Sequence, residues 1–246
     1  MQTLRRSLII LLLAVCGGLL SAPAMADPYV DISDRGGTHL GYCHDTALWE
    51  LNPTLNYGVN TTNSVGDFVG DLVIILRFDL SIVPPGSRFT IAAMILQCTA
   101  VGGGGQTVSV FQIDDANNDW AEGTKTGEAE AGSPCWNDHS YNSVQEWLGG
   151  AGGNTAGTDY INTSLASVAC TTTGAKTFTF NASGIAAIQA RLDAGEGDIE
   201  LILIPGNYNA NVYSQFAMSE HATTAYRPAL QVHFRTSFVI GNSIGM

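Results

Sequence analysis

Apolar residues alternate with polar ones, at a period of two, along most of this chain. In the clearest segment one face carries Leu72, Ile74, Leu76, Phe78 and Leu80. Successive side chains of a β-strand point to opposite faces, so this spacing predicts a strand with a buried face. The other face, with Val73 and Ile75, is also partly apolar, which indicates a strand covered on both sides for part of its length.

The same alternation predicts further strands at 89–98, 107–113, 176–180, 198–204, 211–218 and 229–234. Two segments are helical by pattern. A capping box at 143–146 predicts a short turn that buries Val144, Trp147 and Leu148, and 183–192 predicts a helix ending at a left-handed Gly195. We therefore expect an all-β, jelly-roll-like antiparallel β-sandwich with one or two short capping helices. Its predicted core contains Leu76, Phe78, Met94, Leu96, Val110 and Trp120.

The first 26 residues have the pattern of a cleavable signal peptide. Arg5 and Arg6 precede an apolar run, and Ala24-Met25-Ala26 has the small-x-small spacing that signal peptidase accepts. The sequence therefore predicts an exported, extracellular protein that begins at Asp27. A lipoprotein signal ending at Cys16 is the alternative, although Val15 is bulky where a small residue is preferred.

The remaining chain, 27–246, is long enough for one well-filled domain and short for two. We expect one β-sandwich domain with a short C-terminal tail at 235–246. The full chain has a formal charge of −12; without Arg5 and Arg6 it has 8 basic and 22 acidic residues, a charge of −14. Such a surface argues against nucleic acid and anionic lipid as partners, and no membrane span is predicted.

Cysteine usage agrees with export. Cys16 leaves with the signal, and the four others are Cys43, Cys98, Cys135 and Cys170. An even number in an oxidising compartment, without metal-binding spacing, predicts two disulfides. Three connectivities are possible, and we favour Cys135 with Cys170, which closes the long polar segment, and Cys43 with Cys98.

Six short segments, taken in order, resemble the DNRLRE-type domain. They are 56–58 (Asn-Tyr-Gly), 76–81 (Leu-Arg-Phe-Asp-Leu-Ser), 92–96 (Ala-x-Met-x-Leu), 119–123 (Asp-Trp-Ala-Glu-Gly), 219–220 (Ser-Glu) and 227–230 (Arg-Pro-x-Leu). The resemblance spans about 31–234 and implies a secreted β-sandwich, from a family in which some members are carbohydrate-binding modules with reported alginate affinity. The cysteines, the loop around 135–137 and the tail depart from the family pattern.

The acidic run at 114–119 offers hard oxygen ligands at close spacing. Its candidate ligands are Asp114, Asp115, Asn117 and Asp119. Carboxylate and amide oxygens suit calcium, so calcium is a possible cofactor here. The run lacks the glycine and terminal glutamate of an EF-hand loop, and a solvated acidic turn is an equal alternative.

Aromatic residues beside asparagines are the best indication of function. Sugar rings pack on flat aromatic faces while amides bond their hydroxyls. The candidate ligand-binding residues are Trp136, Asn137, Tyr141, Tyr160, Tyr208 and Tyr213. For each aromatic, the alternative is that it covers the core from a loop.

Three functions follow from these patterns. The first is a secreted, non-catalytic domain that binds polysaccharide. The second is a structural or surface-assembly protein that self-associates through its tail, where 237–240 is a short apolar β segment. The third is a polysaccharide lyase or hydrolase, for which the sequence shows no catalytic constellation.

Overall fold

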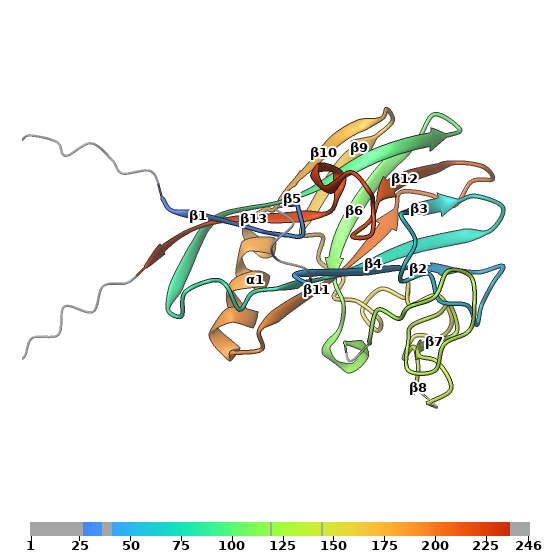
Figure 1. Ribbon diagram of the computed structural model, residues 1–246, viewed down its shortest axis with the longest axis horizontal. Coiled ribbons are helices and arrows are strands. Elements are labelled where there is room, and N and C mark those ends of the chain that lie inside the picture. The colour runs from blue at the N-terminus through green and yellow to red at the C-terminus, as the bar shows by residue number, and fades with distance from the viewer. Residues whose placement is uncertain (1–26, 36–40, 119, 144, 237–246) are drawn as a thin grey trace, which may run out of the picture.

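The computed structural model describes residues 27–35, 41–118, 120–143 and 145–236. The predicted signal peptide and the segment 237–240 lie outside the described residues. The described chain is antiparallel β-structure with one α-helix (Figure 1). The predicted all-β class is therefore confirmed.

The elements follow one another in chain order. They are β1 (Tyr29–Ser33), β2 (Cys43–Trp49), β3 (Thr62–Asp67), β4 (Asp71–Asp79), β5 (Ser87–Gly102), β6 (Gln106–Gln112), η1 (Asp115–Asn117), β7 (Asp138–Ser140), β8 (Gln145–Glu146), β9 (Ala166–Cys170), β10 (Gly174–Thr179), α1 (Ala182–Ala194), β11 (Asp198–Pro205), β12 (Tyr213–Ala217), η2 (Thr224–Tyr226) and β13 (Ala229–Thr236).

Eleven strands of the described chain form one antiparallel sheet. Its main path runs β1-β13-β5-β12-β3-β4-β11-β6-β9, with β10 also paired to β5 and β2 also paired to β4. The nine strands of this main path form a strongly curled half-barrel, which does not divide clearly into the two sheets of a sandwich. Hydrogen bonding continues between β3 and β4, at the pairs Gly66 with Leu72 and Asp67 with Asp71. This pairing is a local hairpin, whereas the pairing of β3 with β12 joins segments about 150 residues apart, which the pattern within one strand does not predict.

The inside of the curl holds the larger hydrophobic cluster. Met94, Leu96 and Phe78 are fully buried there, with Leu76 and Val110. Trp120, the remaining residue of the predicted core, is 1% exposed but lies on the other side of the sheet. All six predicted core residues are therefore buried, in two clusters.

Helix α1 closes one part of the curl, because Ile188 packs into the inner cluster (Figure 1). The side chain of Asn181 caps its N-terminus by accepting from the amide of Gly184. Gly195 ends it in the left-handed conformation, with φ of 74°. The predicted helix and its glycine stop are both confirmed, because local capping chemistry decides them.

The long polar segment from 113 to 165 packs against the outer face of the sheet. Its Trp120, Trp136 and Trp147 form a second cluster with Val73 and Ile75 of β4. The predicted helical turn at 143–146 is wrong: 145–146 is the short strand β8, paired with β7. Trp147 is buried as expected, whereas Leu148 is 60% exposed.

No helix among the described residues is long and apolar enough to cross a membrane.

Candidate functional site

A groove lies where β2, β3 and β12 approach one another. It is lined by Ala47, Trp49, Tyr57, Asn60, Thr62, Asn63, Ser64, Phe68, Leu72 and Gln215, and encloses about 200 Å³. Ala47 and Trp49 belong to β2, and Gln215 of β12 lies opposite Ser64 of β3. Alternation places Thr62 and Ser64 on one face of β3 and Asn63 on the other, so the groove takes side chains from both faces of this strand.

Three aromatic residues line this groove. The rings of Trp49 and Tyr57 have centroids 5.9 Å apart at a tilt of 53°. Phe68, at the tip of the β3–β4 hairpin, is 45% exposed and meets Tyr213 edge-on at 4.8 Å. Flat apolar faces thus border an open groove, an arrangement that suits stacking on a ring.

Polar groups without charge lie between these aromatics. The Asn60 side-chain amide donates to the Asn63 side-chain oxygen at 3.0 Å. Asn63 Nδ2 and Trp49 Nε1 have no hydrogen-bond partner among the described residues. Gln215 and Thr62 add further donors and acceptors to the lining. Amide and hydroxyl groups of this kind bond sugar hydroxyls.

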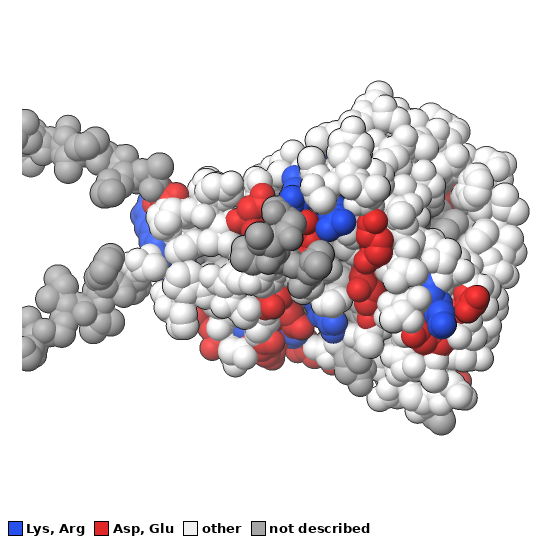
Figure 2. Space-filling model, in the orientation of Figure 1, with Lys and Arg blue, Asp and Glu red and all other residues white. Residues whose placement is uncertain are grey.

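Acidic groups lie beside the groove, while its lining carries none. Asp67 and Asp71 flank the tip of the hairpin that carries Phe68, and Glu50 lies next to them. Burial, together with Glu50 and Asp67, raises the pKa of Asp71. In the orientation of Figure 2, charged side chains concentrate in a band across the molecule, and the end that carries β3 shows few of them. The groove therefore offers a neutral binding surface that repels an anionic ligand at its edge.

The predicted ligand-binding aromatics do not gather into one exposed platform. Trp136 and Tyr160 are buried, at 9% and 6% exposure, in the cluster on the outer face. Tyr208 packs against the same cluster, and burial raises its pKa to about 12. Of the six predicted residues, Tyr213 contacts the groove, through Phe68.

Two of the predicted ligand residues lie away from the groove, in the segment on the outer face. Asn137 is half-buried and lines a separate shallow pocket with Asp138 and Glu146. Tyr141 is partly exposed, and its backbone amide donates to the carbonyl of Ser133.

The residues of the predicted calcium run serve separate structural roles. Asp114 caps η1 by accepting from the amide of Ala116 at 3.1 Å. Asp115 accepts from Arg191 at 2.6 Å, and the buried Asn117 accepts from the amide of Leu148. Asp119 lies outside the described residues. The described members of this run do not converge on a common point.

The four cysteines are buried free thiols, and the two predicted disulfides are not present. Cys43, Cys98 and Cys170 lie in the inner cluster, whereas Cys135 lies in the segment on the outer face. The favoured Cys135 to Cys170 bridge therefore has its two residues on opposite sides of the sheet. Burial raises the pKa of Cys135 to about 11 and that of Cys170 to about 12.

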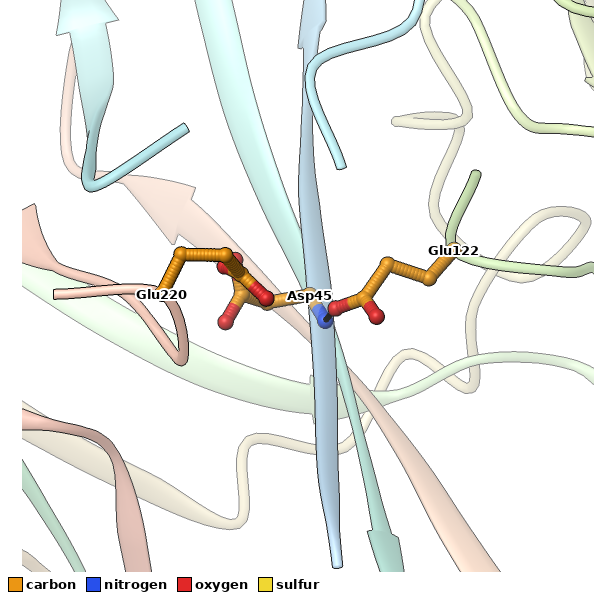
Figure 3. A group of neighbouring side chains, drawn as sticks. All are labelled: Asp45, Glu122 and Glu220. Atoms are coloured by element: carbon orange, nitrogen blue, oxygen red, sulfur yellow. Dashed lines mark hydrogen bonds between the residues drawn. The ribbon is translucent and has the colours of Figure 1, made fainter. Parts of the chain in front are cut away.

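Three carboxylates that the sequence did not single out as ligands meet at the inner face of β2. The carboxylate of Asp45 lies beside that of Glu220, while the carboxylate of Glu122 approaches from the other side and accepts from the Asp45 amide (Figure 3). Burial, followed by the negative charges of Glu220 and Glu122, raises the pKa of Asp45 well above its ordinary value. Burial and the charge of Glu122 raise the pKa of Glu220 to about 7. Among the described residues this is the group whose acidic oxygens could share a metal ion.

A partial signal for both regions was present in the sequence. Segments 56–58, 119–123 and 219–220 belong to the resemblance, and they supply Tyr57 to the groove and Glu122 and Glu220 to the carboxylate group. Strands β2 and β3 were missed because polar residues interrupt their alternation, as His44 and Asp45 do in β2.

Comparisons with protein-family models and with curated proteins found no match. The resemblance to the DNRLRE-type domain thus stays a prediction that rests on the quoted segments.

Proposed function

We propose that this protein is an exported, non-catalytic domain that binds a neutral polysaccharide in the groove between β2, β3 and β12. The observation that carries the proposal is the lining, which combines Trp49, Tyr57 and Phe68 with the amides of Asn60, Asn63 and Gln215. Aromatic faces and amides together match the two faces of a sugar, its C–H groups and its hydroxyls.

The size and charge of the groove narrow the ligand. A volume of about 200 Å³ is below that of pockets for drug-sized ligands, so the groove accommodates a short stretch of a chain while the remainder stays outside. The lining has no charged side chain to bond a uronate, and Asp67 and Asp71 at the edge repel one. A neutral glycan is therefore preferred over an anionic one.

The test is binding of the chain 27–246 to a glycan array, followed by affinity electrophoresis on the polysaccharides that bind. Phe68→Ala and Asn60→Ala should each weaken binding by about 1–2 kcal/mol, as expected for one stacking or hydrogen-bonding contact. Tyr29→Ala is the matched control, because Tyr29 is a 55% exposed aromatic residue on β1 and does not line the groove.

Three results would contradict the proposal. Equal loss of binding in Tyr29→Ala would show that the groove is not the site. Absence of binding to any neutral glycan, together with ordered polymers of the purified protein, would favour the assembly function. Release of new reducing ends or unsaturated products would favour the enzymatic function.

A further inference from the structure

We propose that Asp45, Glu122 and Glu220 together hold a calcium ion on the inner side of β2. This inference does not rest on glycan binding, because the three carboxylates lie outside the lining of the groove. It uses none of the residues of the acidic run at 114–119.

The first support is distance. One carboxylate oxygen from each residue lies within 4.8 Å of the other two. Calcium binds oxygen at about 2.3–2.6 Å, so two ligands of one ion lie at most about 5 Å apart. The three oxygens satisfy this limit with the side chains as they stand. Figure 3 shows that the carboxylates of Asp45 and Glu220 lie side by side and that Glu122 reaches the backbone of Asp45 from a separate part of the chain.

The second support is an unpartnered oxygen on a fully buried side chain. Asp45 has 0% exposure, and its Oδ2 accepts from the amide of Ser219 at 2.8 Å. Its Oδ1 has no hydrogen-bond partner among the described residues. Burying a carboxylate oxygen without a partner lowers the free energy of unfolding by several kcal/mol, unless a proton or a cation binds to it. A shared cation supplies the missing partner.

The third support is the balance of charge around Asp45. The charged groups that act most strongly on its carboxylate are Glu220 and Glu122, and both are negative. Glu122 is bonded to His44 at 3.0 Å. The single proton of the Ser219 hydroxyl lies within reach of both Glu122 and Glu220 and can serve only one oxygen at a time.

The guanidinium of Arg227 lines the same pocket, but it is engaged by the backbone. Its Nε donates to the carbonyl of His221 at 3.0 Å, and its Nη1 donates to the carbonyl of Asp34 at 3.3 Å. Its positive charge acts on Glu220 and offsets part of the negative charge of the three carboxylates, and a divalent cation would offset the remainder.

The fourth support is that the ligands are held in place before any ion binds. The buried Asn56 side chain donates to the carbonyl of Glu122 at 2.8 Å, and the amide of Asp45 donates to Glu122 Oε1 at 2.6 Å. Gly58 lies so close that a Cβ there would be 2.2 Å from the Glu122 carbonyl oxygen. Rigid ligands lose little conformational entropy on binding.

The site is also open to solvent. A pocket of about 370 Å³ is lined by His44, Glu122, Ser219, Glu220 and Arg227, with Asp34 at its edge. It gives an ion a way in and leaves room for water. Waters can therefore complete the six to eight oxygen ligands that calcium takes.

The test is calorimetric titration of the metal-free chain 27–246 with calcium chloride at a fixed pH of about 7.5, together with thermal unfolding in calcium and in EDTA. We expect one ion per chain and an upward shift of Tm in calcium. Asp45→Asn and Glu220→Gln should each weaken binding about tenfold or more, since each replaces a charged ligand group by a neutral amide. Glu128→Gln is the matched control: it removes the same unit charge from a side chain that is 71% exposed, and should leave the affinity unchanged.

Asp45→Asn has a second readout that does not depend on measuring weak binding. It should retain or raise Tm in EDTA, because it removes an unpaired buried charge, and lose the upward shift in calcium. Glu220→Gln is the fallback if Asp45→Asn does not fold. The absence of heat and of a Tm shift at about 10 mM calcium would overturn the proposal and favour a proton shared between Asp45 and Glu220. An equal response to magnesium, or equal loss in Glu128→Gln, would also overturn it.

Discussion

Replacing Glu200 by glutamine should make the protein less sensitive to pH between about 5 and 8. Glu200 lies on β11 with 3% exposure, and its Oε2 has no hydrogen-bond partner among the described residues. Its Oε1 is 3.7 Å from Arg77 Nη1, and the Arg77 guanidinium also donates to the carbonyl of Trp120. Burial raises the pKa of Glu200 from 4.5 to about 8, against the opposing effect of Arg77.

The direction of the effect follows from that raised pKa. At pH 7 the folded carboxyl is mostly neutral while the unfolded one is ionised. Stability from this group is therefore fully present below about pH 4.5 and is lost as the pH rises toward 8. The loss is about 1.4 kcal/mol per pH unit, which gives about 2–3 kcal/mol between pH 5 and pH 7. Glutamine resembles the neutral form at every pH, so Glu200→Gln should not show this loss.

The assay is urea unfolding of both proteins across this pH range, followed by subtraction of their free energies of unfolding. The contributions of Asp45 and Glu220 cancel in the difference, because both proteins retain these residues and Glu200 is not among the groups that shift their pKa values. Glu128→Gln, at an exposed side chain, should show no such trend. A difference that stays constant within about 0.5 kcal/mol from pH 5 to pH 7.5 would refute the reasoning and show that Arg77 keeps Glu200 ionised.

Two further predictions concern packing. Phe78→Ala should lower the free energy of unfolding by about 3–5 kcal/mol, because the ring is fully buried in the inner cluster; a loss below about 0.5 kcal/mol in urea unfolding would show that this face is not the core. Gly58→Ala should lower the free energy of unfolding by about 1–3 kcal/mol and displace the turn that carries Glu122, because the new Cβ would overlap the backbone of Glu122. The same displacement should weaken calcium binding. An unchanged Tm and an unchanged calcium affinity would contradict this close approach.

Local patterns were enough to predict much of the framework. The alternation at 72–80 predicts β4, and the pattern at 183–192 predicts α1 with its stop at Gly195. Both succeed because neighbouring residues decide them: the pleat fixes which side chains share a face, and a left-handed residue ends the helix.

The same patterns could not decide where the loop aromatics lie. The residues around Trp136 and Tyr160 in the sequence are typical of an exposed sugar-binding surface. Both aromatics are nevertheless buried in the cluster on the outer face of β4. Burial depends on whether a sheet face is available to cover, and that depends on segments distant in the sequence. For the same reason the two predicted disulfides fail, since Cys135 and Cys170 are 35 positions apart and lie on opposite sides of the sheet.

The sequence by itself determined the helix α1 and those strands whose alternation is regular, namely β4, β5, β6, β10, β11, β12 and β13, because these follow from periodicity and capping within a few residues. Only the tertiary structure decided that the strands form one curled sheet and that Asp45, Glu122 and Glu220 meet. Taken by itself, Asp45 is one of the polar residues that interrupt the alternation of β2, and it does not predict a metal site. Its partners come from turns far along the chain, and the attraction or repulsion between such groups exists only once the sheet has brought them within a few ångströms of one another.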